Sequence, residues 1–416
     1  MKKLLMLIMC LLLVAAMVSC GDAKDTPDET EPQTPVDTNK GIRTEAPKTQ
    51  ASVEAPNPLD YDYFHVFKAP EGNPRDIVYN YMYAMSQIKW VATESWTTDW
   101  KVPQDYTVNL PYVKGKTYYG LPYSLARSSL DEFSQYVENE SFTPNSHYYE
   151  EIIGNNCSSA MDLAYNQILN FPGYCQLRPS TNRTDLLKFP DGIEVPPARS
   201  SNPDDWISQT VFSHNGLDAM YNGYAQLGKG DILYRMIDGS GHTRMVSKVE
   251  VTRSVAGKLV PAKSYIYCIE QTNTWADNKR NSTWFVDRKY TFSECAELLF
   301  MPVTFHIFHE DNPVLEDAYI MMKGKNSPES VKKLLNGVVE STFPLTYVRA
   351  TVTDSEGKIV GDTYKNNMHS TYKVSVRNFD SQLKISKLPA GTYTFDLRAG
   401  IARGGVTLES FQFTIS

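Results

Sequence analysis

The sequence has 416 residues, of which 41% are hydrophobic and 12% aromatic, and a formal net charge of -7. At roughly 150 residues per domain, this length indicates two or three domains, and the hydrophobic content is sufficient for buried cores. The acidic balance, without a stripe of clustered Lys and Arg, argues against a nucleic-acid-binding surface.

The first twenty residues have the pattern of a secretory signal. Two lysines precede an apolar run over 4–17, which is too short for a comfortable transmembrane helix. Small residues then lead to Cys20 and a glycine. This ending resembles the lipobox of bacterial lipoproteins, which implies cleavage before Cys20 and lipidation of its thiol; an ordinary signal peptide is the alternative. We therefore expect a signal peptide over 1–20 and a lipid-anchored protein of the bacterial cell envelope, periplasmic or surface-exposed.

Residues 21–57 are rich in Asp, Glu, Thr and Pro and have almost no large apolar side chains. Such a composition cannot bury enough surface to fold, so this segment is interpreted as a disordered linker. Helices are then expected from Asn73 and over about 129–138. An aromatic segment lies between them, and its tryptophans are expected to pack in a core, with a role in lining a substrate groove as the alternative: Trp90, Trp96 and Trp100.

A helix is also expected from about Ser158, because apolar residues recur at helical spacing after it. Gly, Asn and Asn precede Cys157, which places this cysteine at or just before the helix N-terminus. Unpaired N–H groups and the helix dipole favour a thiolate there. Cys157 is therefore a candidate nucleophile, and a small buried core residue is the alternative. The helix is expected to end near Phe171.

The remaining cysteines show no CxxC pair and no His at metal-ligand spacing, so a structural zinc site is not expected. The acyl-transfer reaction inferred below implies no metal or cofactor. In an exported protein, a disulfide between Cys175 and Cys295 can form.

After a loop over 178–205, the pattern changes to β-structure. Strands are expected over 230–235, 242–249 and 264–270, with a tight turn at 238–241 between the first two. A helix that carries a cysteine, followed by an antiparallel sheet, is an α+β arrangement.

From residue 309 onward, short alternating stretches are separated by turns. This spacing predicts a small immunoglobulin-like β-sandwich, expected to serve as an accessory domain that is either a spacer or a surface binder. The expected strands are 348–353, 372–376, 383–385 and 392–397.

The order of three residues indicates a catalytic constellation. A cysteine nucleophile needs a base, and the base needs an orienting group. His242 begins a strand after the tight turn, and Glu270 ends the next strand. If these strands are neighbours, the Glu270 carboxylate can accept a hydrogen bond from the imidazole.

Four short motifs extend this pattern: Gly120-Leu121-Pro122-Tyr123, Gly230-Asp231-Ile232-Leu233, Gly241-His242 and Ile269-Glu270-Gln271. Together they resemble the NlpC-type papain-like cysteine peptidases, and most closely their CHAP amidase relatives. The resemblance covers roughly residues 118–305 and implies a papain-like catalytic domain over 58–308.

Carried over residue by residue, the resemblance implies that Cys157 is the nucleophile, His242 the base and Glu270 the orienting acid. It also implies that Tyr123 helps to bind the substrate or the oxyanion. The backbone N–H of Cys157 or Ser158 is the other natural oxyanion donor.

The sequence departs from the family pattern at three places. Asn156 stands where Asp or Gln usually precedes the cysteine, and Ser158-Ser159 follows it. Thr272 replaces the Asn of the usual Glu-Gln-Asn, so Gln271 or Asn273 is a further candidate for the third role.

The expected function is therefore a cell-envelope cysteine hydrolase that cleaves an amide bond in peptidoglycan through a Cys-His-Glu acyl-enzyme mechanism. Its partners would be peptidoglycan, as substrate, and the membrane, through the N-terminal lipid. The expected domains are the signal (1–20), the linker (21–57), the catalytic domain (58–308) and the β-sandwich (309–416).

One alternative function is that of a transglutaminase-like acyltransferase, which has the same Cys-His-acid order. The other is a catalytically degenerate binding lipoprotein.

Overall fold

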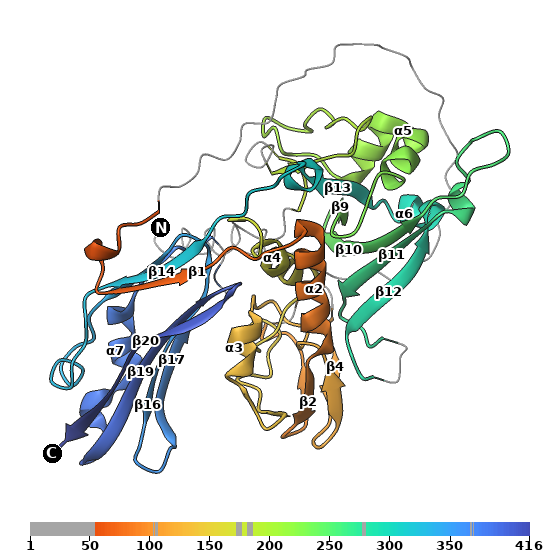
Figure 1. Ribbon diagram of the computed structural model, residues 1–416. Helices are drawn as coiled ribbons and strands as arrows, with labels where there is room; N and C mark the ends of the chain where they lie inside the picture. Colours follow the sequence, from red (N-terminus) through yellow and green to blue (C-terminus); the bar gives the residue numbers. More distant parts are fainter. Residues whose placement is uncertain are drawn as a thin grey trace, which may run out of the picture.

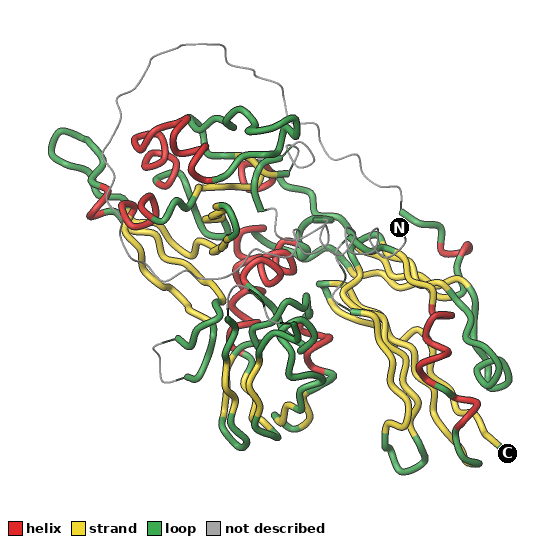
Figure 2. The backbone as a smooth tube through the Cα atoms, turned by 180° about the vertical axis from the view of Figure 1, so that it is seen from behind, coloured by secondary structure: helices red, strands yellow, loops and turns green. Residues whose placement is uncertain are grey.

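The computed structural model describes residues 55–102, 104, 107–171, 177–180, 186–276, 280–366, 368 and 370–416. The expected signal peptide, the anchoring Cys20 and most of the expected linker lie outside these residues. The described chain is α+β, with several sheets and few helices, as the sequence predicts at this level (Figures 1 and 2). In the described part, no helix has the length and apolar character needed to cross a membrane.

The regular elements are as follows. The helices are α2 (Pro74–Gln87), α3 (Leu130–Ser134), α4 (Cys157–Tyr165), α5 (Ser208–Tyr224), α6 (Phe292–Glu297) and α7 (Asp380–Leu383), with 3-10 turns η1 (Pro58–Asp60), η2 (Pro261–Lys263), η3 (His306–His309), η4 (Val376–Phe379) and η5 (Ile385–Lys387). The strands are β1 (Tyr63–Phe67), β2 (Lys89–Ala92), β3 (Trp96–Thr98), β4 (Leu110–Tyr112), β5 (Thr117–Tyr119), β6 (Val137–Glu138), β7 (Ser141–Phe142), β8 (Leu187–Lys188), β9 (Ile232–Ile237), β10 (Ser240–Glu250), β11 (Tyr265–Gln271), β12 (Trp284–Thr291), β13 (Met301–Phe305), β14 (Ala318–Lys323), β15 (Val338–Ser341), β16 (Leu345–Thr353), β17 (Ile359–Lys365), β18 (Lys373–Ser375), β19 (Gly391–Ile401) and β20 (Gly404–Ile415).

A six-stranded sheet with the order β12-β11-β10-β9-β13-β8 is the centre of the first unit, and its neighbouring strands are antiparallel. Figure 1 shows α2 and α4 on one side of this sheet and α5 on the other. The three strands expected over 230–270 are β9, β10 and β11, and they are neighbours in the order that the sequence predicts.

Helix α2 is attached to this sheet by a buried ion pair. The Asn73 side chain caps the helix by accepting from the Arg75 N–H at 2.9 Å. The Arg75 guanidinium lies 2.9 Å from the fully buried Asp231 carboxylate at the start of β9. Burial raises the pKa of Asp231, while Arg75 and the Gly228 N–H stabilise its charge. The Gly-Asp motif therefore fixes the junction between α2 and the sheet.

Aromatic side chains fill the space beside a smaller sheet with the order β5-β2-β7-β6. Trp90 and Trp96 are buried, and the Trp90 ring stacks on Tyr118 with centroids 4.9 Å apart. The Trp90 indole N–H donates to the Gly120 carbonyl at 2.8 Å. These two tryptophans are core residues, as expected.

The second unit consists of two antiparallel four-stranded sheets, β1-β14-β15-β18 and β17-β16-β19-β20 (Figure 2). Its buried side chains form a core separate from that of the first unit. Strand β1 pairs with β14, so the chain enters this second unit before it forms the first. Residues 63–67, which the sequence analysis assigns to the first domain, are therefore part of the second unit.

Three local predictions are wrong or too long. The helix expected over 129–138 ends at Ser134, and the chain then forms β6 and turns into β7 at Asn139 and Glu140, which adopt positive φ. The helix that begins at Cys157 ends at Tyr165, before the expected Phe171. The strand expected over 383–385 is the end of α7 and the start of η5.

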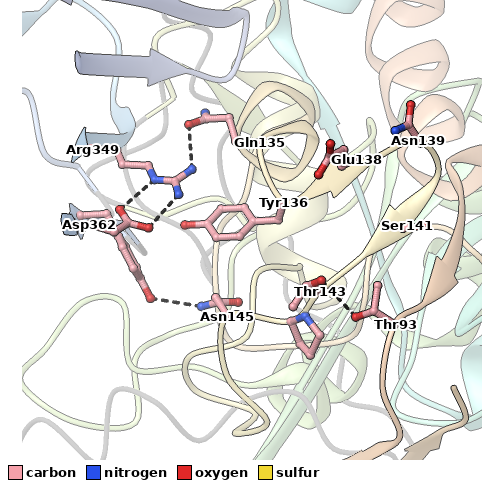
Figure 3. Close-up of a pocket in the computed structure, with 12 residues that line it drawn as sticks. Thr93, Gln135, Tyr136, Glu138, Asn139, Ser141, Thr143, Asn145, Arg349 and Asp362 are labelled. Atoms are coloured by element: carbon pink, nitrogen blue, oxygen red, sulfur yellow. Dashed lines mark hydrogen bonds and ion pairs between the residues drawn. The ribbon is translucent and has the colours of Figure 1, made fainter. Parts of the chain in front are cut away.

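Polar contacts join the two units. The Asp131 carboxylate in α3 accepts from the Tyr347 hydroxyl at 2.5 Å and lies 3.5 Å from the Arg398 guanidinium. The Gln167 amide donates to the Ala402 carbonyl at 2.8 Å. Between the β6–β7 hairpin and strands β16 and β17, the units form an open pocket of about 750 Å³ (Figure 3).

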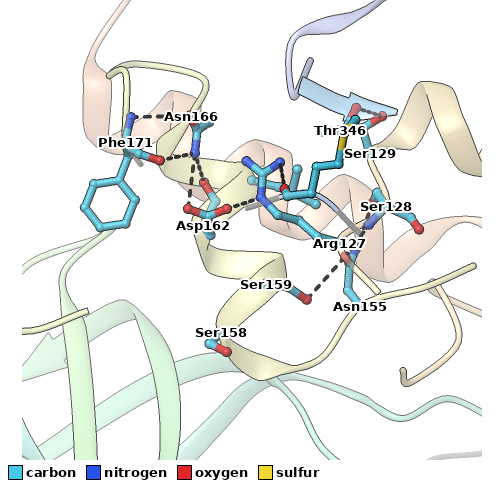
Figure 4. A network of polar contacts seen from close by, with 12 residues as sticks. Arg127, Ser128, Ser129, Asn155, Ser158, Ser159, Asp162, Asn166, Phe171 and Thr346 are labelled. Atoms are coloured by element: carbon cyan, nitrogen blue, oxygen red, sulfur yellow. Dashed lines mark hydrogen bonds and ion pairs between the residues drawn. The ribbon is translucent and has the colours of Figure 1, made fainter. Parts of the chain in front are cut away.

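A buried charge cluster lies at the same interface. Arg127 forms an ion pair with Asp162 of α4, and one of its terminal nitrogens lies 3.5 Å from the Met368 carbonyl (Figure 4). The neighbouring Glu132 is buried, and burial raises its pKa to about 8, against the opposing effects of an Asn366 hydrogen bond and the Arg127 charge. Glu132 therefore retains a proton at neutral pH in the folded chain.

This pKa predicts that stability falls as the pH rises. Between the ordinary Glu value of 4.5 and about 8, only the folded state keeps the Glu132 proton, so the free energy of unfolding decreases by up to about 1.4 kcal/mol per pH unit. Glu132→Gln should remove this contribution, so the variant gains thermal stability over the wild type at pH 8.5 but not at pH 4.5. Glu356→Gln, in an exposed turn, is the control. If Glu132→Gln differed from the wild type in melting temperature by the same amount at pH 8.5 and at pH 4.5, the prediction would be wrong.

Candidate functional site

Helix α4 begins with a complete capping box. The Asn156 side-chain oxygen accepts from the N–H groups of Ser158 and Ser159 at 3.1 and 2.9 Å, and the Ser159 hydroxyl accepts from the Asn156 N–H at 2.9 Å. Figure 4 shows Ser158 and Ser159 at the start of the helix. The helix therefore starts at Cys157, within one residue of the expected position. The Ser158 N–H, an expected oxyanion donor, is already bonded to Asn156.

Cys157 is fully buried and disulfide-bonded, and its partner is outside the described residues. Only a thiolate is nucleophilic, so the sulfur of Cys157 is not a nucleophile in this state. Cys295 is a free buried thiol in α6, and burial raises its pKa to about 12. A disulfide between Cys175 and Cys295, which the sequence allows, is therefore wrong.

His242 and Glu270 lie together, as the sequence predicts for neighbouring strands. The His242 Nε2 atom lies 2.6 Å from a Glu270 carboxylate oxygen, and both side chains are buried. The antiparallel register pairs Met245 of β10 with Ile269 of β11, which places Arg244 and Glu270 on the same face of the sheet. His242 shares this face because side chains alternate along a strand.

Glu270 has further partners that the sequence analysis does not identify. Its carboxylate accepts from Arg244 Nε at 2.8 Å and from the Tyr290 hydroxyl at 2.5 Å, and it lies 3.4 Å from Arg288. Burial alone would raise the pKa of Glu270, but the Arg244 charge and the His242 hydrogen bond outweigh it and hold the pKa well below its usual range. An ionised carboxylate only accepts hydrogen bonds, so Nε2 of His242 is the donor.

Arg244 completes this cluster. Its guanidinium lies between the Tyr290 and Phe300 rings, 4.0 and 3.9 Å from their centroids. The alternation of β10 is the sequence signal that could have identified Arg244, because it stands two residues after His242 and therefore shares its face.

The described contacts place His242 and helix α4 on opposite faces of the sheet. Thr243 contacts Met161 of α4, with 3.1 Å between its hydroxyl and the sulfur, and Cys157 precedes Met161 by one helical turn. Thr243 and His242 are adjacent in a regular part of β10 and point to opposite faces. Within the described residues, the hydrogen-bond partner of His242 is Glu270. The sheet backbone therefore separates the imidazole from the face that α4 covers.

The remaining expected site residues have structural contacts. Tyr123 is buried and stacks on Tyr149, with centroids 5.4 Å apart. Gln271 is buried, and its amide donates to the Leu121 carbonyl at 2.9 Å. The Asn273 side-chain oxygen is buried and has no hydrogen-bond partner among the described residues. In the part of the chain that the structure covers, no group of His, Cys, Asp and Glu could hold a metal ion.

Replacing Glu270 by Gln should destabilise the protein strongly. The substitution leaves the buried Arg244 guanidinium without its counter-charge, and breaking a buried ion pair in this way costs about 3–5 kcal/mol. Urea unfolding of the variant should therefore show a much lower midpoint. Glu250→Gln, which removes a half-exposed carboxylate at the end of the adjacent strand, should leave the midpoint almost unchanged. Equal midpoints for the two variants would show that the Glu270 charge does not stabilise the fold through Arg244.

Cys157 should be unreactive in the native protein. A sulfur in a buried disulfide has no thiolate for iodoacetamide to alkylate, so peptide mass spectrometry of the oxidised native chain should find Cys157 unmodified from pH 4 to 10. After reduction in denaturant, the same peptide should be alkylated completely. Rapid alkylation at neutral pH without reductant would show that the thiol is free.

No family model matches the chain, and no curated protein or solved structure matches it.

Proposed function

We propose that this chain is a non-catalytic binding lipoprotein of the bacterial cell envelope, anchored through Cys20, with peptidoglycan as its ligand. In this proposal, a papain-like domain and an immunoglobulin-like sandwich have kept their folds without the catalytic chemistry. Peptidoglycan is proposed because the motifs around Cys157, His242 and Glu270 resemble those of enzymes that act on it.

The observation that carries the proposal is the separation of the expected nucleophile from the expected base. Acyl transfer by a cysteine requires a thiolate within hydrogen-bond reach of its base. Here Cys157 is disulfide-bonded, and His242 lies on the sheet face opposite the one that contacts α4.

The surroundings of Glu270 support the same conclusion. Its carboxylate is shared by His242, Arg244 and Tyr290. A carboxylate with these partners is needed to neutralise a buried Arg, and this is sufficient reason for its presence in the core. The His242–Glu270 contact therefore has a structural explanation that needs no catalysis.

The peptidoglycan hydrolase is the second candidate, favoured by one observation. An ionised Glu270 that accepts from His242 Nε2 leaves Nδ1 as the nitrogen that can act as a base. This function requires reduction of the Cys157 disulfide and movement of His242 toward α4. A transglutaminase-like activity has the same requirements.

The test uses insoluble peptidoglycan sacculi with and without a reductant. The purified chain should co-sediment with the sacculi and release no soluble fragments under either condition. Cys157→Ala and His242→Ala should co-sediment like the wild type, with His147→Ala, an exposed histidine, as the control. Fragment release by the reduced wild type that is lost in Cys157→Ala would establish the hydrolase instead.

A further inference from the structure

The pocket between the two units has the dimensions and the chemistry of a ligand site. Its volume of about 750 Å³ lies within the roughly 300–1,000 Å³ that is typical of small-molecule sites. Its lining residues, which Figure 3 draws, come from Thr93 and the segment 135–145 around the β6–β7 hairpin on one side, and from β16 and β17 on the other. The pocket therefore exists only when both units are folded and in contact.

One wall of the pocket is held in place by mutual contacts. Arg349 donates to both carboxylate oxygens of Asp362, at 3.0 and 2.7 Å, and lies 3.3 Å from the Gln135 amide oxygen. The same guanidinium lies over the Tyr136 ring, 4.8 Å from its centroid. The Asn145 amide donates to the Tyr364 hydroxyl across the interface at 3.1 Å. This wall is pre-organised, which lowers the entropic cost of binding.

Other polar side chains in the pocket make no hydrogen bond to the described part of the chain. The side chains of Tyr136, Glu138, Asn139 and Ser141 line the pocket and have no hydrogen-bond partner among the described residues. They supply hydroxyl, amide and carboxylate groups together with one aromatic ring. A ligand that displaces the water around these side chains must offer several closely spaced hydrogen-bond donors and acceptors in its place.

Charge and polarity restrict the class of ligand. Asp362 neutralises Arg349, and Glu138 leaves a negative charge in the pocket, so an anionic ligand is disfavoured. Pro144 is the one aliphatic residue in the described lining, so an apolar ligand or side chain has little surface to contact. A sugar ring presents hydroxyl groups at its edge and C–H groups on its face, which suits polar side chains around a tyrosine ring.

We infer that this pocket binds a neutral oligosaccharide, with Tyr136 contacting a sugar ring and Asn139 and Ser141 bonding to its hydroxyl groups. The inference deepens the proposed function, on which it rests for an envelope polymer as ligand. A glycan strand of the cell wall and another neutral polysaccharide share this chemistry.

The first experiment is calorimetric titration of the purified chain with tri-N-acetylchitotriose and with maltotriose. The wild type should bind at least one of them. Tyr136→Ala and Asn139→Gly should each weaken binding by about tenfold or more, and glycine retains the positive φ of position 139. Tyr83→Ala, an exposed tyrosine on α2, should bind like the wild type. Circular dichroism melting checks that each variant is folded.

Three outcomes would overturn the inference. One is the absence of binding of either trisaccharide at about 10 mM by the folded wild type. The second is unchanged affinity in both Tyr136→Ala and Asn139→Gly. The third is a peptide that binds in the pocket where neither trisaccharide does.

Sacculus sedimentation with the same variants separates this inference from the proposed function. If the wild type binds sacculi and Tyr136→Ala binds them equally well, the pocket is not the sugar site, and the proposed envelope function stands. Trisaccharide binding without sacculus binding would refute the peptidoglycan ligand and leave the pocket intact.

Discussion

The buried charge of Glu270 constrains how three strands of the first unit are aligned. An ionised carboxylate in a core is tolerated only with charged and hydrogen-bonding partners, and here they come from two neighbouring strands. Arg244 is supplied by β10 and Tyr290 by β12. Any shift of register by one residue would turn one of these side chains to the other face. The cluster therefore fixes the alignment of β10, β11 and β12.

This alignment also determines where His242 lies. A histidine two residues from Arg244 must share its face, and it completes the shell of Glu270. The same alternation turns Thr243 toward Met161 of α4. The arrangement that satisfies Glu270 thus directs the imidazole away from the helix that carries Cys157.

The sequence predicts the α+β class, the start of α4 and the neighbouring strands β9, β10 and β11, because capping residues, turn residues and alternation are local signals. It also predicts the His242–Glu270 contact, since adjacent strands bring them together. It does not predict on which face α4 packs, because Cys157 and His242 are far apart in the chain and their relation depends on tertiary packing. The short helix α7 is missed for a related reason: buried Leu383 and Ile385 are two residues apart, which fits a strand as well as consecutive helical turns.

The pairing of β1 with β14 is a further long-range feature that no local signal reveals. It places the start of the described chain in the second unit, so the first unit is inserted between β1 and β14. An insertion held at both ends is more restricted than two units joined by one linker, and this favours a persistent interface. Contacts between the units, such as Asp131 with Tyr347 and Asn145 with Tyr364, then cost less conformational entropy when they form. The pocket beside Tyr136 depends on this connectivity, because its two walls belong to units that the chain topology keeps together.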